Sequence, residues 1–547
     1  MNGARPSAVM PAPPRPDRGW VQVVLLGAGA MQAAALAWPA GRAELAQPHG
    51  TWQILALAVF AWALAGSTTT RQAVHRTWSF SAAWLLGSTW WLYISLHTHG
   101  GLPAWMAAVA VFALAAALAL IYAGCMAVQW RWSQPHANWL WRSMGFAVAW
   151  TLAEWTRGHI VTGFPWGAIG YAHIDSPLRH WAPWLGVYGV GALAAALAAL
   201  LAELPLAWAR RRQFPAPARA PRSVRVWGVA VVAALLALPW LPSAPARETA
   251  PLRVRLLQGN VPQDLKFGAA AAQAVEDYRQ ALLDSPAELT VTPETAIPFV
   301  PEQWPREMRA AFRPTPEHAW IVGLPLRAPS AAAPARYTNS AWALLPQSEA
   351  DARYDKRHLV PFGEFVPPLF QWFVQRMQIP LGDFARGATQ QAPVAWRGQR
   401  IAINICFEDL FGEELARDFQ QPGAEPTLLL NLSNLAWFGH TVALDQHLHI
   451  SRMRALELGR PMLRATNTGA TAIIDAQGRV RQHVPHHTRA ALDAEVRGIE
   501  GPPTPYARWS GRWGLWPMAA LLLLAAWGLV RAHRRQGGSP DAAGFTS

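Results

Sequence analysis

Long apolar segments, separated by short polar ones, run through the first half of the chain and return near its end. The segments cover residues 20–40, 51–67, 79–97, 103–128, 138–156, 183–204, 226–242 and 513–531. Each has roughly the 17–25 residues that a helix needs to cross a bilayer. The pattern therefore predicts a multi-pass α-helical membrane domain of about eight spans.

Beyond residue 250 the apolar runs shorten and alternate with amphipathic stretches. The runs predict strands at residues 252–258, 288–292, 319–324, 340–345, 401–405, 427–432 and 470–475. The stretches between them predict helices at residues 269–284, 302–313, 410–419 and 443–458. Such alternation is typical of a layered α/β domain.

These two patterns divide the chain into five parts. They are a disordered cytoplasmic N-terminus (1–19), a seven-helix transmembrane domain (20–245), an α/β domain (250–505), a C-terminal transmembrane helix (513–531) and a cytoplasmic tail (532–547). A hydrophobic content of 52% over 547 residues also exceeds what one soluble domain of this size holds.

The distribution of arginine predicts how the chain crosses the membrane. With the N-terminus inside, sixteen arginines flank the inner ends of the spans and five flank the outer ends. Cytoplasmic loops carry the excess of Lys and Arg in membrane proteins, which also accounts for the net charge of +14. An odd number of spans then places the α/β domain outside, in the periplasm of a bacterium. Since no base-reading module is present, we expect no nucleic-acid partner.

Lysine is rare in this chain. Only Lys266 and Lys356 are lysines among the 47 Lys and Arg residues. Where Arg supplies almost every positive charge, a retained Lys indicates a need for a compact ammonium with a tunable pKa. Lys356 lies in a Pro- and Gly-punctuated loop that also holds Glu364.

Cys406, one of two cysteines, ends the apolar run 401–405, which predicts a buried strand. The carboxyl edge of α/β sheets is where catalytic groups gather, so Cys406 is either a packed small hydrophobe or a nucleophile. Glu294 also follows a predicted strand. If Glu294, Lys356 and Cys406 meet, the carboxylate can take the thiol proton, while the ammonium lowers the thiol pKa and stabilises an oxyanion.

The predicted outer loop 157–182 is rich in aromatic side chains, among them Phe164, Trp166 and Tyr171. Aromatic residues form belts at membrane interfaces. A lipid-lined floor beneath the α/β domain is the second interpretation. The sequence leaves both open.

Four motifs, in this order along the chain, resemble the nitrilase superfamily. They are Pro293-Glu294-Thr295, the run Tyr354-Asp355-Lys356-Arg357-His358-Leu359-Val360-Pro361-Phe362-Gly363-Glu364, Ile405-Cys406-Phe407-Glu408, and Asn431-Leu432-Ser433-Asn434-Leu435-Ala436-Trp437-Phe438-Gly439. Within the superfamily, the chain resembles the inner-membrane acyltransferases of bacterial lipoprotein maturation. The likeness covers almost the whole chain, membrane spans included.

The resemblance implies a four-layer αββα sandwich and a triad. Glu294 is the expected general base, Lys356 the oxyanion and charge stabiliser, and Cys406 the nucleophile. Glu364 and Glu408 are the expected supporting carboxylates. We also expect substrate contacts at Phe407, Trp437, Phe438 and Trp166; Phe407 stands where many relatives have Tyr.

The implied reaction is ping-pong. Cys406 takes an acyl chain from a phospholipid, typically phosphatidylethanolamine, as a thioester, and the α-amine of the diacylglyceryl-cysteine of apolipoproteins then attacks that thioester. We expect the protein to lie in the lipid bilayer. We expect a monomer with no cofactor and no metal.

Three other functions compete with this one. A histidine-bound metal is disfavoured, because His447 and His449 point about 200° apart on a helix. A transporter is disfavoured, because no span carries paired acids or bases. A membrane-tethered amidase that hydrolyses a small amide fits the same triad. A lipid-facing opening favours acyl transfer, whereas a closed polar pocket favours hydrolysis.

Overall fold

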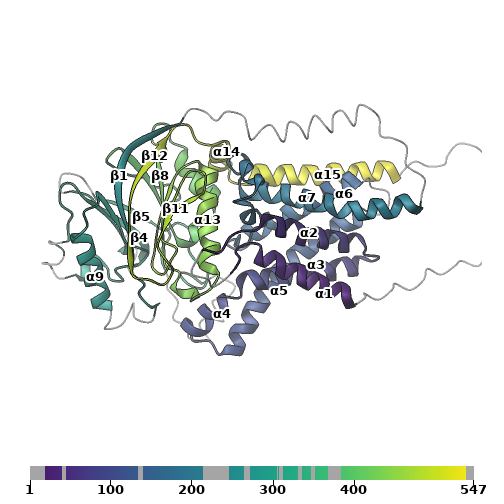
Figure 1. The fold of residues 1–547 in the computed structure, drawn as a ribbon, viewed down its shortest axis with the longest axis horizontal. Coiled ribbons are helices and arrows are strands. Elements are labelled where there is room, and N and C mark those ends of the chain that lie inside the picture. Colours follow the sequence, from purple (N-terminus) through teal and green to yellow (C-terminus); the bar gives the residue numbers. More distant parts are fainter. Residues whose placement is uncertain are drawn as a thin grey trace, which may run out of the picture.

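The structure is a computed structural model with two adjoining parts, a bundle of helices and a domain built on two β-sheets (Figure 1). It describes residues 19–39, 45–133, 139–213, 246–263, 271–304, 306, 309, 312–329, 336–346, 351–366 and 384–537.

Helices occupy every predicted span that the structure describes. They are α1 (Gly19–Ala34), α2 (Gly50–Ala65), α3 (Thr70–Thr89), α5 (Ala104–Trp132), α6 (Trp139–His159), α7 (Ala182–Gln213) and α15 (Trp516–Gly537), with the short α4 (Leu92–Ile94) and the π-helical turn η1 (Ser95–His99) after α3. The predicted span 226–242 lies outside the described residues. Small alanines and stacked rings, such as Phe60 on Phe80 at 4.6 Å, fill the bundle core.

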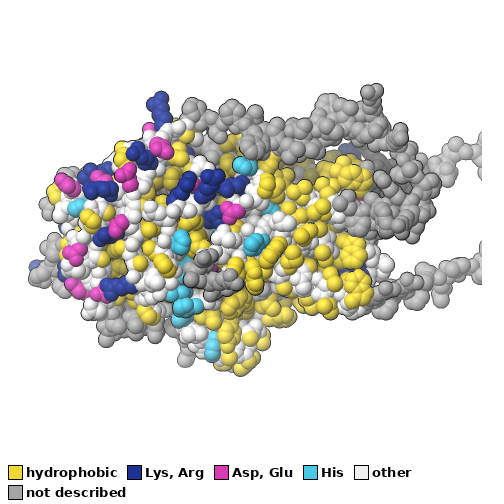
Figure 2. Space-filling view, in the orientation of Figure 1, with side chains coloured by type: hydrophobic (Ala, Val, Ile, Leu, Met, Phe, Trp, Pro, Cys, Tyr) yellow, Lys and Arg dark blue, Asp and Glu magenta, His cyan; other side chains and the backbone are white. Residues whose placement is uncertain are grey.

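The bundle has the character of a membrane protein, but eight spans are not confirmed. Among the described helices, α5 and the segment Pro177–Glu203 are long and apolar enough to cross a bilayer. The pair α14 (Pro505–Trp513) and α15, bent by 91°, is a third if it counts as one span. Helices α1 and α2 are apolar but shorter. Apolar side chains cover much of the visible bundle surface (Figure 2).

Each sheet has six strands in the described part of the chain. The first has the order β12-β1-β2-β3-β4-β5 and the second the order β11-β10-β9-β8-β7-β6. The strands are β1 (Arg247–Gln258), β2 (Leu289–Val291), β3 (Ala319–Arg327), β4 (Tyr337–Leu344), β5 (Ala352–Asp355), β6 (Val394–Trp396), β7 (Gln399–Ile405), β8 (Leu428–Ser433), β9 (Met462–Thr466), β10 (Ala472–Ile474), β11 (Val480–His483) and β12 (Ala490–Glu500).

The two sheets face each other across an apolar core to which both contribute, for example Leu256 and Val291 from the first and Ile403 and Leu430 from the second. Helix α9 (Ala271–Leu283) packs on the outer face of the first sheet. Helix α13 (Ala443–Leu458) packs on the outer face of the second. The layers α9, sheet, sheet and α13 are the αββα sandwich that the resemblance implies.

Helix α13 also forms the junction with the bundle, between the second sheet and α7 (Figure 1). One continuous apolar cluster joins Leu448 and Met453 of α13 to Trp91, Trp166 and Val187 of the bundle. Polar contacts add to it: Glu457 accepts a hydrogen bond from the Val187 amide at 2.5 Å. The α/β domain is therefore docked on the bundle through a buried interface.

The predicted strands and the helix 443–458 are present, whereas the outcome differs for the predicted helices 410–419 and 302–313. Residues 410–419 do not form one α-helix. Phe411 (φ −111°, ψ 77°) separates η8 (Cys406–Leu410) from α12 (Gly412–Leu415), which continues directly as the 3-10 turn η9 (Ala416–Phe419). Much of the predicted helix 302–313 lies outside the described residues. Strands β5, β6, β9, β11 and β12 were not predicted from the sequence.

Candidate active site

Three chemically active side chains follow three strand ends. Glu294 follows β2, Lys356 follows β5 and Cys406 follows β7. Strands β2 and β3 are parallel, and two antiparallel steps through β4 bring β5 into the same direction. The carboxyl ends of β2 and β5 therefore share one sheet edge, where the second sheet delivers Cys406.

Lys356 is the centre of this cluster. Its side chain is fully buried, and its Nζ donates to Glu294 Oε1 at 3.2 Å and to Glu364 Oε1 at 2.9 Å. The Asn339 amide nitrogen donates to the same two oxygens, at 2.8 and 2.6 Å. Glu294 Oε2 accepts a hydrogen bond from the backbone N–H of Asn434 at 2.8 Å. Both predicted carboxylates are thus fixed around one ammonium.

The Glu294 loop lies very close to the neighbouring strand. A Cβ added to Gly323 of β3 would lie 2.2 Å from the Pro293 carbonyl oxygen. Such a contact is impossible, so only glycine permits this approach. Gly323 thereby lets Glu294 reach the position from which it contacts Lys356.

Cys406 occupies a strained backbone conformation, with φ of +54°. A non-glycine residue in that region costs about 1–3 kcal/mol and persists only where the surroundings enforce it. Glu408 supplies that enforcement. Its Oε2 accepts from the Ile405 amide at 2.6 Å and from the Tyr354 hydroxyl at 2.9 Å. Its Oε1 accepts from the backbone amides of Arg357 at 2.6 Å and His358 at 3.1 Å, which ties the Cys406 turn to the Lys356 loop.

We expect Glu408→Gln to destabilise the α/β domain by about 3 kcal/mol. The carboxylate is fully buried and accepts hydrogen bonds from four donors, whereas a Gln side chain would place its own N–H donors against two of them. Thermal unfolding in detergent measures the loss. The matched control is Glu500→Gln, which removes an exposed ion pair with Arg400 and should leave the midpoint unchanged. Equal midpoints for the two variants would show that Glu408 does not hold the turn.

The protonation of the cluster differs from the sequence-based expectation. Burial raises the pKa of the Cys406 thiol, the Glu294 carboxylate raises it further, and Lys356 opposes both. Lys356 thus lowers the thiol pKa as expected, but burial and Glu294 outweigh it, so the net shift is upward. Burial lowers the pKa of Lys356, but Glu294 and Glu364 outweigh burial and raise it overall. At rest the site holds an ammonium and a neutral thiol, which is hydrogen-bonded to Glu294.

A layer of aromatic and polar side chains lies on the bundle side of Cys406. His447 of α13 has its Nε2 3.2 Å from the Cys406 carbonyl oxygen, and its ring lies 5.4 Å from that of Trp166. Burial holds the pKa of His447 well below its usual value, so the neutral ring donates to that carbonyl. Trp166 in turn donates to Gln446 at 2.8 Å.

The structure separates the four predicted substrate contacts. Trp166 and Phe438 lie together, 6.1 Å apart between ring centroids, on the side facing the bundle. Trp437 is 38% exposed and its ring lies 5.7 Å from that of His99 in η1. Phe407 is buried and packs on Phe411 and His358 instead.

Asn339 is a site residue that was not predicted from the sequence. It lies in β4 between Thr338 and Ser340, and a short polar run at the start of a strand gives no pattern that points to catalysis. In the described part of the chain, no group of three or more His, Cys, Asp or Glu could hold a metal ion. His447 contacts the Cys406 carbonyl, whereas His449 contacts that of Ala46.

Two facing sheets with a Glu–Lys–Cys cluster at their edge define a carbon-nitrogen hydrolase domain, and the family model for "Carbon-nitrogen hydrolase" matches residues 253–498. The model "Apolipoprotein N-acyltransferase N-terminal domain" matches residues 34–201. The apolipoprotein N-acyltransferase of Verminephrobacter eiseniae is 46% identical to this chain, covering 91% of it and 94% of the relative. That of Ralstonia nicotianae is 43% identical, covering 90% and 91%. The chain therefore belongs to the apolipoprotein N-acyltransferase family.

Proposed function

We propose that the protein transfers an acyl chain from a phospholipid, through a thioester on Cys406, to the α-amino group of the diacylglyceryl-cysteine of apolipoproteins. Its family makes it an N-acyltransferase of lipoprotein maturation. Phosphatidylethanolamine is the proposed donor. Glu294, Lys356 and Cys406 are the proposed catalytic residues, and Glu364 and Glu408 support them.

The observation that carries this proposal is the position of Cys406 between two apolar cores. The partly buried Cys406 packs both against the core between the sheets and against the cluster that continues into the bundle. Phe438 and Trp166, on the bundle side, belong to or pack against the same cluster. An acyl chain that approaches from the bundle meets apolar surface next to the thiol, as transfer from a lipid requires.

The chemistry follows from the contacts. Glu294 takes the thiol proton as Sγ attacks the ester carbonyl, and Lys356 stabilises the oxyanion. The ester C–O bond breaks, the leaving lysophospholipid oxygen takes the proton from Glu294 to become a hydroxyl, and the acyl chain stays on sulfur. The acceptor amine then attacks the thioester and gives a proton to Glu294. The C–S bond breaks, and the thiolate regains its proton.

Intact-protein mass spectrometry tests the first half-reaction. We expect purified protein incubated with phospholipid, without acceptor, to gain the mass of one acyl chain, because a transferase must exclude water from its thioester. Cys406→Ser should gain nothing, since an alkoxide is far harder to form than a thiolate. Steady release of fatty acid without an adduct, or turnover of a small amide alone, would favour the amidase.

We further propose a bacterial inner-membrane protein with eight spans, both termini in the cytoplasm and the α/β domain in the periplasm, acting as a monomer. The arginine distribution supports this topology, as do helices at the predicted spans other than 226–242. A reporter fused after residue 242 should be active outside the cytoplasm. Activity only inside would overturn the topology and leave the proposed chemistry untouched.

A further inference from the structure

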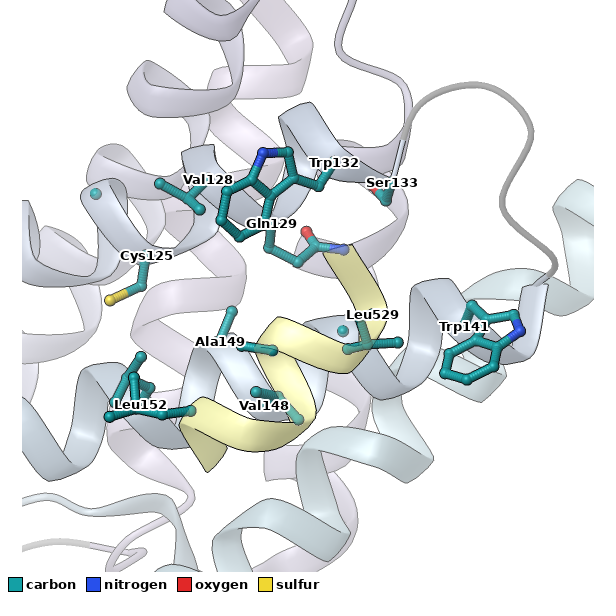
Figure 3. A pocket seen from close by; sticks show the side chains of 14 residues that line it. Cys125, Val128, Gln129, Trp132, Ser133, Trp141, Val148, Ala149, Leu152 and Leu529 are labelled. Carbon is teal, nitrogen blue, oxygen red and sulfur yellow. The ribbon is translucent and has the colours of Figure 1, made fainter. Parts of the chain in front are cut away.

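A groove opens on the flank of the bundle between α5, α6 and α15 (Figure 3). Its lining lies in the C-terminal part of α5, between Trp141 and Leu152 of α6 and between Leu523 and Leu529 of α15, and none of it belongs to the α/β domain that carries Cys406. The groove has a volume of about 350 Å³, within the range of roughly 300–1,000 Å³ for small-molecule sites. Its walls are mostly apolar, with Val128, Leu152 and Leu523 among them.

Polar groups gather at one end of the groove. They are the Gln129 amide, Ser133 and the indoles of Trp132 and Trp141 (Figure 3). The side-chain amide of Gln129 makes no hydrogen bond to another described residue, which is unusual for an amide in a membrane bundle. Trp132 and Trp141 are 43% and 40% exposed, as is typical of tryptophans at the lipid–water interface. The opposite end, near Cys125 and Leu152, is apolar.

The polar end also carries positive charge. Arg131 is exposed, lies between the lining residues Gln129 and Trp132, and has no ion pair to another described residue. Arg531, two positions after the lining residue Leu529, stacks instead on Trp527 at 5.1 Å, and neither Arg531 nor Trp527 lines the groove. By contrast, Arg142 at this end is neutralised by Glu203. From its apolar end to its polar end, the groove presents apolar side chains, then an amide and two indoles, and then positive charge. A phospholipid has its acyl chain, its glycerol esters and its phosphate in the same order.

We propose that this groove binds an anionic phospholipid of the cytoplasmic leaflet, which the enzyme does not consume. Its acyl chain fills the space between α5 and α15. Its ester oxygens accept from Gln129 and the two indoles, and its headgroup lies at Arg131. The bound lipid then bridges α15 to α5, since α15 packs mainly on α6.

Glycine supplies a clean way to block the groove. Gly124 lines it, and a Cβ added there meets nothing within 4 Å, so Gly124→Leu extends into the groove without strain in α5. Gly528 of α15 is the matched control: an added Cβ also meets nothing within 4 Å, but Gly528 is not part of the lining. Both variants add the same side chain to a membrane helix.

The experiment is native mass spectrometry of the full-length, delipidated protein with an equimolar mixture of phosphatidylglycerol and phosphatidylethanolamine. We expect one retained phosphatidylglycerol on the wild type and on Gly528→Leu, and about tenfold less on Gly124→Leu. Arg131→Gln should abolish the preference for the anionic lipid, a loss of about tenfold in selectivity. Equal retention in Gly124→Leu and Gly528→Leu, or no preference in the wild type, would overturn the proposal.

A second measurement separates this site from the donor site. Acylation of Cys406 by phospholipid should proceed in Gly124→Leu at the wild-type rate, because no lining residue of the groove belongs to the α/β domain that carries Cys406. Loss of acylation in Gly124→Leu with normal acylation in Gly528→Leu would mean that the groove delivers the donor, and the role of a retained, unconsumed lipid would be overturned.

Discussion

Glu294→Gln is expected to reduce the acylation of Cys406 by about 10³-fold, the usual contribution of a positioned general base. The need for the base follows from the site itself. Burial and the neighbouring carboxylates raise the pKa of the thiol, so almost none of it is ionised at neutral pH. A group that accepts the proton during attack must therefore be present, and the thiol is hydrogen-bonded to Glu294.

The matched comparison is Glu364→Gln. Glu364 binds the same ammonium at 2.9 Å and the same Asn339 amide, so this variant changes the charge around Lys356 to a similar extent. Glu364→Gln should reduce the acylation rate by only about tenfold, because Glu294 remains as the base. Single-turnover acylation followed by intact mass measures both variants. Equal losses would mean that the two carboxylates share the proton and that the assignment of Glu294 alone is wrong.

Local sequence was sufficient to find the three catalytic candidates, because each lies directly after an apolar run or in a distinctive loop. The near-absence of lysine elsewhere in the chain made Lys356 conspicuous. The layered α/β architecture followed from the same alternation of runs. These features are encoded within a few residues of chain, and short-range pattern is what sequence reasoning detects best.

Features that depend on tertiary contacts were not predictable. Asn339 joins the site only because β4 lies beside both carboxylate loops. The pKa of Cys406 is raised because the thiol is buried. The positions of Glu294, Lys356 and Cys406 along the chain do not indicate how deeply the thiol is buried. Strand β12 was missed because its exposed positions are charged, and it is stabilised by pairing with β1 along its length.

Lys356→Arg is expected to lower the acylation rate by about 10³-fold, as loss of an oxyanion-stabilising donor does elsewhere. Because Glu294 and Glu364 raise the pKa of Lys356, both the native ammonium and the substituted guanidinium are charged at neutral pH. Charge is therefore held constant, and the variant tests geometry alone. The native side chain is fully buried, and its Nζ already shares two carboxylate oxygens with the Asn339 amide. A planar guanidinium with five donors cannot fit this slot without displacing Asn339 or Glu294.

The control for this variant is Arg255→Lys, the reverse exchange in an ion pair with the exposed Asp493 on the first sheet. It should leave the rate unchanged, because a surface ion pair tolerates either cation. Thermal unfolding of both variants separates misfolding from loss of chemistry: we expect Lys356→Arg to unfold cooperatively but to gain no acyl mass on Cys406. Near-normal acylation of Lys356→Arg would show that the site requires only a positive field near the thiol, and the role of Lys356 as a positioned oxyanion donor would be wrong.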